Sequence, residues 1–205
     1  AQSRLRVIDE KLSVLAPQFQ KNLKKSTESY EMVIRDHAEL AGLPDNAIAT
    51  AADTAKEKGY DNAWVFTLHQ PSFLAYITYA TNRARREELW RAFNSRAYND
   101  AYDNRATICE LVALKTERAK LLGYDTHADF TLAERMAGSS ERVFDFIHDL
   151  LASYKPAAIR DLNDLRDYAH RVDNLSPTDF APWDTAFYRE KLQQERLHFS
   201  SEDVR

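Results

Sequence analysis

Glycine and cysteine are both scarce in this chain of 205 residues. There are four glycines, and each stands alone where a segment with helical periodicity ends. Phosphate loops, dinucleotide-binding loops and nucleophile elbows all need clustered glycines, so the sequence excludes these three kinds of site. The single cysteine, Cys109, allows neither an internal disulfide nor a zinc cluster built from cysteines.

Long apolar runs and an excess of charge of one sign are also missing. No stretch approaches the roughly 20 apolar residues that a membrane-spanning helix needs. The N-terminal Ala1 to Arg4 leads into no apolar run, so we expect no signal peptide. The 28 basic and 32 acidic residues give a net charge of −4, which argues against a nucleic-acid surface. We therefore expect no nucleic-acid partner, no membrane partner and a cytoplasmic location, with the periplasm as the alternative.

The histidines are too widely spaced to form a local metal site. A helical zinc protease needs two histidines one turn apart with a glutamate between them, as in H-E-x-x-H. No such pair exists among the six histidines, which are His37, His69, His127, His148, His170 and His198. We therefore assign no catalytic residue and no metal ligand, and leave the substrate-binding residues unknown. A dispersed site that uses His127 and Asp129, or His148 and Asp149, is a rival with little support.

The composition and the periodicity that remain are those of a helical protein. Abundant Ala, Leu, Glu, Lys and Arg favour helices. The segment from Ser3 to about Ile34 predicts one long helix, with a kink or short break at Pro17 and an extended piece over residues 30–34. Its apolar stripe is Leu5, Ile8, Leu12, Leu15, Phe19 and Leu23.

Further helices are expected along the chain, and one segment predicts a strand. Trp64 to Leu68 is aromatic and β-branched, so it is the strand candidate. In the first half of the chain we expect helices over residues 44–58 and 83–98, with a short aromatic helix capped by Ser72 between them. The next helices are one that is capped by Asn104 and ends at Gly123, and one that starts at Thr126. A long helix from Ser139 or Ser140 toward His170, with a kink at Pro156, and a last helix after Pro182 complete the list. The predicted fold is mostly α and multihelical, with a small β element around Trp64–Leu68. We expect residues 1–205 to be a single helical segment and assign no internal domain boundary.

Three groups of side chains allow a functional and a structural interpretation. The aromatic residues Trp64, Phe66, Phe73, Tyr76 and Tyr79 could line a peptide groove, but we favour a core. The run Arg83, Arg85, Arg86 and Arg91 alternates with Glu87 and Glu88, which is typical of a solvated helix face. Cys109 stands beside Ile108 on a stripe with Leu111, Val112, Ala119 and Leu122, so we interpret it as a small buried residue and not as a nucleophile.

The last residues predict the start of another helix. Phe199-Ser200-Ser201-Glu202-Asp203 combines a cap with an acidic first turn, and the chain ends at Arg205. We therefore expect that the chain is divided before that helix is complete.

Several phrases of the sequence together resemble one enzyme family. They are Glu39-Leu40-Ala41-Gly42-Leu43-Pro44, Trp64-Val65-Phe66-Thr67-Leu68 with Pro71-Ser72, Tyr102-Asp103-Asn104-Arg105, Ala119-Lys120-Leu121-Leu122-Gly123-Tyr124, Leu132-Ala133-Glu134-Arg135-Met136-Ala137, and Pro182-Trp183-Asp184 followed by Phe187-Tyr188 and Lys191-Leu192. In this order the phrases resemble the thimet-oligopeptidase family of zinc metallopeptidases, from about Leu5 to Arg205. The bacterial peptidyl-dipeptidase branch is the most similar in these motifs.

The resemblance implies a helical peptidase that cleaves short peptides inside a channel, with zinc held by an H-E-x-x-H motif and a further glutamate. In the family these residues lie downstream of the part that this chain matches, so none is carried over. The resemblance implies a scaffold and channel-wall segment that binds no zinc itself and is inactive alone, with the catalytic half of the polypeptide as its partner. Tyr76, Tyr79 and Arg83 are candidates for channel-facing residues, without an assigned role.

A non-enzymatic helical module that binds peptides or proteins is the alternative function. The gene beyond Arg205 distinguishes the two hypotheses: a stop codon there favours the module, and an H-E-x-x-H motif favours the peptidase. Under the peptidase hypothesis we also expect the isolated chain to self-associate or to expose large apolar patches.

Overall fold

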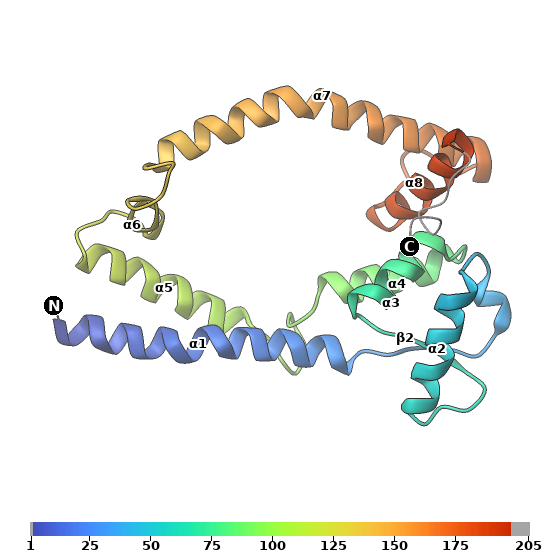
Figure 1. The fold of residues 1–205 in the computed structure, drawn as a ribbon, viewed down its shortest axis with the longest axis horizontal. Coiled ribbons are helices and arrows are strands. Elements are labelled where there is room, and N and C mark those ends of the chain that lie inside the picture. Colours follow the sequence, from blue (N-terminus) through green and yellow to red (C-terminus); the bar gives the residue numbers. More distant parts are fainter. Residues whose placement is uncertain (1, 198–205) are drawn as a thin grey trace. The chain divides into compact units, whose positions relative to one another are not determined.

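A computed structural model of the chain describes residues 2–197, and the predicted helix start at Phe199–Asp203 lies outside this range. The fold is mostly α with one small sheet, as expected (Figure 1). No helix within residues 2–197 combines the length and apolarity needed to cross a membrane. The elements are α1 (Gln2–Ser29), β1 (Met32–Ile34), the 3-10 helix η1 (His37–Leu40), α2 (Asp45–Glu57), β2 (Trp64–Phe66), α3 (Gln70–Tyr79), α4 (Arg83–Asn94), α5 (Arg105–Leu121), α6 (His127–Leu132), α7 (Ser140–Asp173) and α8 (Pro182–Leu197).

The described chain divides into two compact units. The first unit comprises residues 2–25 and 97–159, and the second comprises residues 26–96 and 160–197. The long helices α1 and α7 each run from the first unit into the second. The expectation of one undivided helical segment over residues 1–205 stays a prediction.

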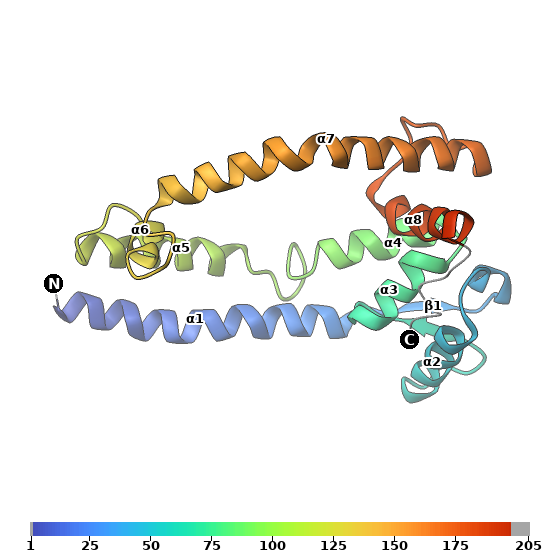
Figure 2. The same ribbon diagram turned by 45° about the horizontal axis from the view of Figure 1, so that its top comes forward.

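The second unit is built around the two-stranded sheet. The strand predicted over Trp64–Leu68 exists as β2, and the extended piece predicted after the first helix is β1. The strands pair antiparallel with Val33 opposite Val65. Figure 2 shows α2 beside the sheet, against which it packs.

The aromatic cluster belongs to the core of this unit, as favoured over a peptide groove. Phe66, Phe73 and Tyr76 are buried in one apolar cluster, and Trp64 and Tyr79 pack against it. The rings of Phe66 and Tyr76 meet edge to face with their centroids 4.7 Å apart, an arrangement that aromatic pairs prefer. Tyr76 itself is fully buried.

The start of α3 differs from the prediction that Ser72 is its cap. The helix begins at Gln70, and Pro71 occupies its first turn, where a missing backbone N–H costs nothing. Ser72 lies inside the helix, and its Oγ accepts a hydrogen bond of 3.0 Å from the backbone N–H of Thr67. The serine therefore links the helix to the segment that leaves β2.

In the first unit, α1 and α5 are connected by charged side chains. Arg4 of α1 makes a two-pronged ion pair with Glu117 of α5, with N–O distances of 2.6 and 2.7 Å. Arg118 pairs with Asp9 at 2.7 Å. These pairs are partly exposed, so each one contributes little to stability.

The two prolines inside long helices do not interrupt them. Pro17 lies within α1 and Pro156 within α7, and both helices are continuous through these positions. Of the two alternatives expected at Pro17, a kink or a short break, the short break is therefore wrong. Each proline removes one backbone donor, but the helix continues on both sides of it.

The apolar stripe expected on α5 is mostly not buried. Ile108 is 45% exposed and Val112 is 59% exposed, whereas Leu114 and Ala119 are buried. Cys109 is also exposed, so the interpretation as a small buried residue is wrong. The apolar side of a helix can be read from the sequence, but whether it is covered depends on what packs against it.

Burial is distributed unequally between the two units. Among the described residues, the buried hydrophobic side chains of the first unit are Ile8, Ala97, Leu114 and Ala119. The other buried hydrophobic side chains belong to the second unit. Conversely, all but three of the large hydrophobic side chains that are exposed belong to the first unit, the exceptions being Leu74, Val172 and Leu197.

Asn104 is a buried polar residue of the first unit. It takes the position before α5, as expected, but its side chain makes no capping bond there. Instead its Nδ2 donates to the Phe19 carbonyl at 3.0 Å, and its Oδ1 accepts from Asn22 at 2.9 Å. The side chain thus joins the start of α5 to the middle of α1.

We predict that Asn104→Ala lowers the free energy of unfolding by about 1–3 kcal/mol, because it removes two part-buried hydrogen bonds between α5 and α1. Urea denaturation followed by circular dichroism measures this change. The control is Asn94→Ala, which removes an exposed amide that donates to the Trp90 carbonyl and should change stability by less than about 0.5 kcal/mol. Equal effects of the two substitutions would contradict the role of Asn104.

Candidate functional site

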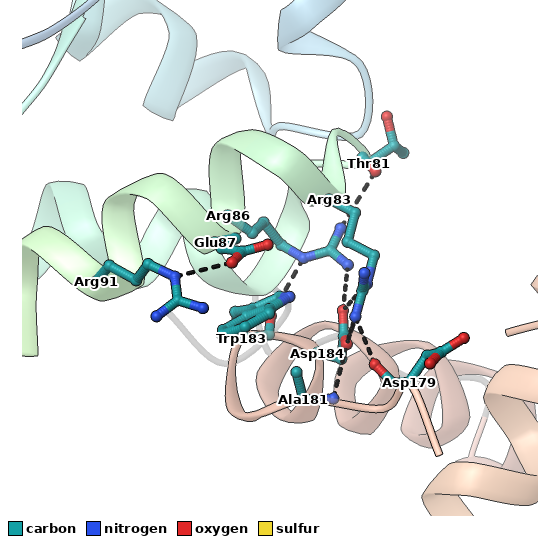
Figure 3. Close-up of polar contacts among 9 residues, drawn as sticks. All are labelled: Thr81, Arg83, Arg86, Glu87, Arg91, Asp179, Ala181, Trp183 and Asp184. Carbon is teal, nitrogen blue, oxygen red and sulfur yellow. Dashed lines mark hydrogen bonds and ion pairs between the residues drawn. The ribbon is translucent and has the colours of Figure 1, made fainter. Parts of the chain in front are cut away.

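The most highly charged buried feature of the described chain begins at the N-terminus of α4. Asn82 caps this helix, and its Oδ1 accepts a hydrogen bond from the backbone N–H of Arg85 at 3.2 Å. The cap fixes the start of the helix, so Arg83 and Arg86 stand three residues apart on one face. Both side chains reach the first turn of α8 (Figure 3).

The carboxylate of Asp184 accepts hydrogen bonds from both arginines. Its side chain is fully buried. Arg83 donates to its two oxygens from Nε and Nη2, with a shortest distance of 2.8 Å, and Arg86 donates from Nη2 at 3.0 Å. A carboxylate shared by two guanidinium groups compensates much of the cost of burying its charge.

Asp184 also organises the helix to which it belongs. Pro182 is the first residue of α8, so Asp184 is the third. Its Oδ2 accepts a 3.0 Å hydrogen bond from the backbone N–H of Ala181, directly before the helix. This is the reach of an acidic residue back to the helix cap, as in a capping box. The same carboxylate therefore starts α8 and holds α4.

Arg86 has a partner for each of its donor nitrogens. Nη1 donates to the carbonyl of Ala80 at 2.8 Å. Nη1 also donates to the carbonyl of Thr81 at 3.2 Å, and Nε donates to that of Trp183 at 3.3 Å (Figure 3). The side chain is 1% exposed, and its guanidinium lies 4.0 Å from the centroid of the Phe187 ring. One arginine thus connects the end of α3, the start of α4 and the start of α8.

The solvated helix face expected for the arginine run is therefore wrong for part of the run. Arg91 is exposed and pairs with Glu87, as expected, but Arg86 is fully buried. Burial lowers the pKa of Arg86, and Asp184 opposes this shift. The hydrogen bond to Asp184 instead raises the pKa of Arg83. The sequence gives no direct sign that Arg86 is buried, because its partner Asp184 lies about a hundred residues further along the chain.

Beside this cluster the second unit has a hollow of mixed polar and apolar lining, with a volume of about 240 Å³. It is lined by Thr81, Arg83, Arg86, Asp173, Leu175, Phe187, Tyr188 and Lys191. Burial raises the pKa of the Tyr188 hydroxyl most, and the hydrogen bond with Asp173 raises it further. Both arginines in the lining are already held by Asp184, and the carboxylate itself accepts three partners. The arrangement is therefore suited to holding helices together, not to proton transfer.

The carboxylate of the candidate pair His127 and Asp129 is held by hydrogen bonds at a helix start. Asp129 uses one carboxylate oxygen to accept from Ser140 Oγ at 2.6 Å and the other to accept from Thr126 Oγ1 at 2.7 Å. These hydrogen bonds lower the pKa of Asp129, and the one from Ser140 has the larger effect. Its role is to start α6, where Thr126 caps the helix as predicted. Burial lowers the pKa of His127, and its Nδ1 is buried without a hydrogen-bond partner among the described residues.

Comparison with known proteins decides the family. Residues 76–205 match Peptidase family M3. The chain belongs to this family. The resemblance to thimet-oligopeptidase-like enzymes is thereby confirmed.

The relatives are peptidases that are much longer than this chain. Oligopeptidase A of Haemophilus influenzae is 37% identical over 209 residues, which cover 100% of this chain and 30% of the relative. Oligopeptidase A of Escherichia coli is 36% identical with the same two coverages. The dipeptidyl carboxypeptidase of Escherichia coli is 33% identical and is covered to 28%. The chain thus spans about a third of the length of these relatives.

The relatives thus include both oligopeptidase A and a dipeptidyl carboxypeptidase. The zinc implied by the resemblance does not fit the described residues. Within residues 2–197 no group of three or more His, Cys, Asp or Glu side chains could hold a metal ion. No chemical step can therefore be derived for zinc from this segment.

We predict that Asp184→Asn destabilises the second unit by about 3–5 kcal/mol, because it leaves the buried Arg86 charge without its counter-charge. Chemical denaturation measures the change. The control is Asp164→Asn, which breaks an exposed pair with Arg196 at 3.1 Å and should cost no more than about 1 kcal/mol. A small loss for Asp184→Asn would show that the cluster does not hold α4 and α8 together.

Proposed function

We propose that this chain is the scaffold and channel-wall segment of a zinc metallopeptidase that hydrolyses short peptides. The observation that carries the proposal is the match of the whole chain to about a third of each peptidase relative. The catalytic zinc and its ligands then belong to the part of the polypeptide outside this segment. The isolated chain binds no zinc and hydrolyses no peptide.

Several features of the described residues support a scaffold role. In the charged cluster, Arg83 and Arg86 donate hydrogen bonds to Asp184, within the protein itself. The aromatic cluster is core, and Asp129 serves a helix start. The partner implied by the proposal is the catalytic half of the same polypeptide, and the substrates of the whole enzyme are short peptides. The cytoplasmic location stays a prediction.

We predict that the purified 205-residue chain carries substoichiometric zinc after dialysis and cleaves no short peptide. Metal analysis by mass spectrometry and a fluorogenic peptide assay, with and without a chelator, test both statements. Oligopeptidase A of Escherichia coli is the positive control for the assay. One zinc per chain, together with hydrolysis that the chelator abolishes, would overturn the proposal.

The gene that encodes this segment separates the proposal from its rival. An H-E-x-x-H motif downstream of Arg205 supports the peptidase. A stop codon soon after Arg205 supports the non-enzymatic binding module.

We also predict that His127→Ala and His148→Ala leave the peptidase activity of the longer polypeptide unchanged within experimental error. The carboxylate near His127 is held by Ser140 and Thr126. His148 and Asp149 are consecutive residues of α7, so their side chains do not face each other. The ratio kcat/KM for a short peptide is the measurement. A loss of more than about tenfold in kcat/KM, which corresponds to about 1.4 kcal/mol, would support the dispersed site instead.

A further inference from the structure

The first half of α7 is a long apolar surface that the described chain leaves uncovered. Every residue from Lys120 to Asp164 is at least partly exposed. Within this stretch the large apolar side chains of α7 lie mainly in solvent: Phe144, Phe146, Ile147, Leu151, Tyr154 and Ile159 are between 48 and 66% exposed. Contiguous exposure of this kind marks an interaction surface, whereas scattered single residues do not.

The apolar side chains are arranged as a broad face along the helix. Phe144, Ile147, Leu151 and Tyr154 succeed one another at three- and four-residue steps, so they lie in one row. Phe146 and Leu150 widen this row on one side. At about 100° per residue the face covers roughly half of the circumference or more, which is wider than the stripe of a helix that packs on one neighbour. Asp145, Asp149 and Ser153 lie on the remaining side.

A hollow on the same helix lacks its opposite wall. It has a volume of about 390 Å³ and is lined by His148, Leu151, Ala152, Lys155, Pro156 and Ile159. All six residues belong to α7. A hollow that one helix alone forms is closed only when another element packs against that helix.

The size of the face argues against a second copy of this chain as its occupant. From Phe144 to Ile159 the helix is about 24 Å long and about 10 Å wide. A pair of such faces buries well under the roughly 800 Å² per partner of a standard interface. A partner that covers half of the helix circumference must instead surround it with more than one element.

The lengths of the relatives indicate where such elements come from. Each matched peptidase contains about 70% of its length outside the region that this chain covers. The first unit contains few buried hydrophobic side chains of its own, so further chain is needed to give it a core.

We propose that the apolar face of α7, centred on Ile147, Leu151 and Tyr154, is the docking surface for the remainder of the family M3 polypeptide. The occupant is a part of the polypeptide from outside the matched segment, and it packs with apolar side chains and helices over the exposed side chains of α7 and over the hollow. This inference rests on the proposed function, since it requires a longer polypeptide. The face is then buried in the whole enzyme and exposed to solvent in the isolated segment.

The experiment compares thiol labelling at two positions of α7 in the isolated chain and in the full polypeptide that its gene encodes. Leu151→Cys and Ser153→Cys are each made in a Cys109→Ser background, and modification by a maleimide is followed at that residue by peptide mass mapping. In the isolated chain both cysteines should react rapidly. In the full polypeptide residue 151 should react at least about tenfold more slowly, because a covered thiol reacts only when the contact opens, while residue 153 should react at its former rate.

The other outcomes overturn the inference in distinguishable ways. Rapid labelling of residue 151 in the full polypeptide would show that the face is not covered there, and would leave the proposed function standing. Slow labelling in the isolated chain that speeds up on dilution would show that a second copy is the occupant. A gene that ends soon after Arg205 removes the proposed function and this inference together.

A second pair of variants checks the labelling result by stability. Leu151→Asp should lower the Tm of the full polypeptide by several degrees, because it places a charge in an apolar contact. It should leave the Tm of the isolated chain unchanged, because the side chain is 54% exposed there. Ser153→Asp, the matched control, should leave both unchanged. An equal effect of Leu151→Asp on the two proteins would contradict the docking surface.

Discussion

The carboxylate of Asp184 is the group on which the second unit depends. A fully buried charge is tolerated only if hydrogen bonds replace the water that it has lost. Asp184 obtains these bonds from Arg83, Arg86 and the backbone of Ala181. Because the donors come from α4 and from the segment before α8, satisfying the carboxylate also fixes where α8 starts. Arg86 extends the constraint to the end of α3 through the Ala80 and Thr81 carbonyls.

The two units solve the problem of stability differently. The second unit has a sheet, an aromatic core and this buried ion cluster. The first unit relies on partly exposed ion pairs between α1 and α5, on the buried amide of Asn104 and on very few buried apolar side chains. Because surface ion pairs contribute little, the first unit has the weaker internal stabilisation. Its large apolar side chains are nevertheless numerous, and most of them are exposed.

Local signals in the sequence predicted most helices, and long-range contacts explain what they missed. Thr126 and Asp129 form the start of α6 in the expected way because cap and helix are adjacent in the chain. The burial of Arg86 was not predictable, since Asp184 is far away in sequence and a run of alternating charges usually faces water. Cys109 was misjudged for a related reason: its helical stripe is apolar, but residues 2–197 place no element over it.

The phrase Pro182-Trp183-Asp184 helped to indicate the family, and the structure explains it without chemistry. Proline suits the first position of a helix, the Trp183 carbonyl accepts from Arg86, and Asp184 joins two helices. A phrase that identifies a peptidase family can thus consist of residues that hold helices together in this structure. Family membership therefore transfers the architecture to this chain directly, whereas catalysis has to be argued from a metal site, and residues 2–197 contain none. Under the proposed function, the uncovered face of α7 and the missing metal site have one common cause, because folding and catalysis are both completed by chain outside this segment.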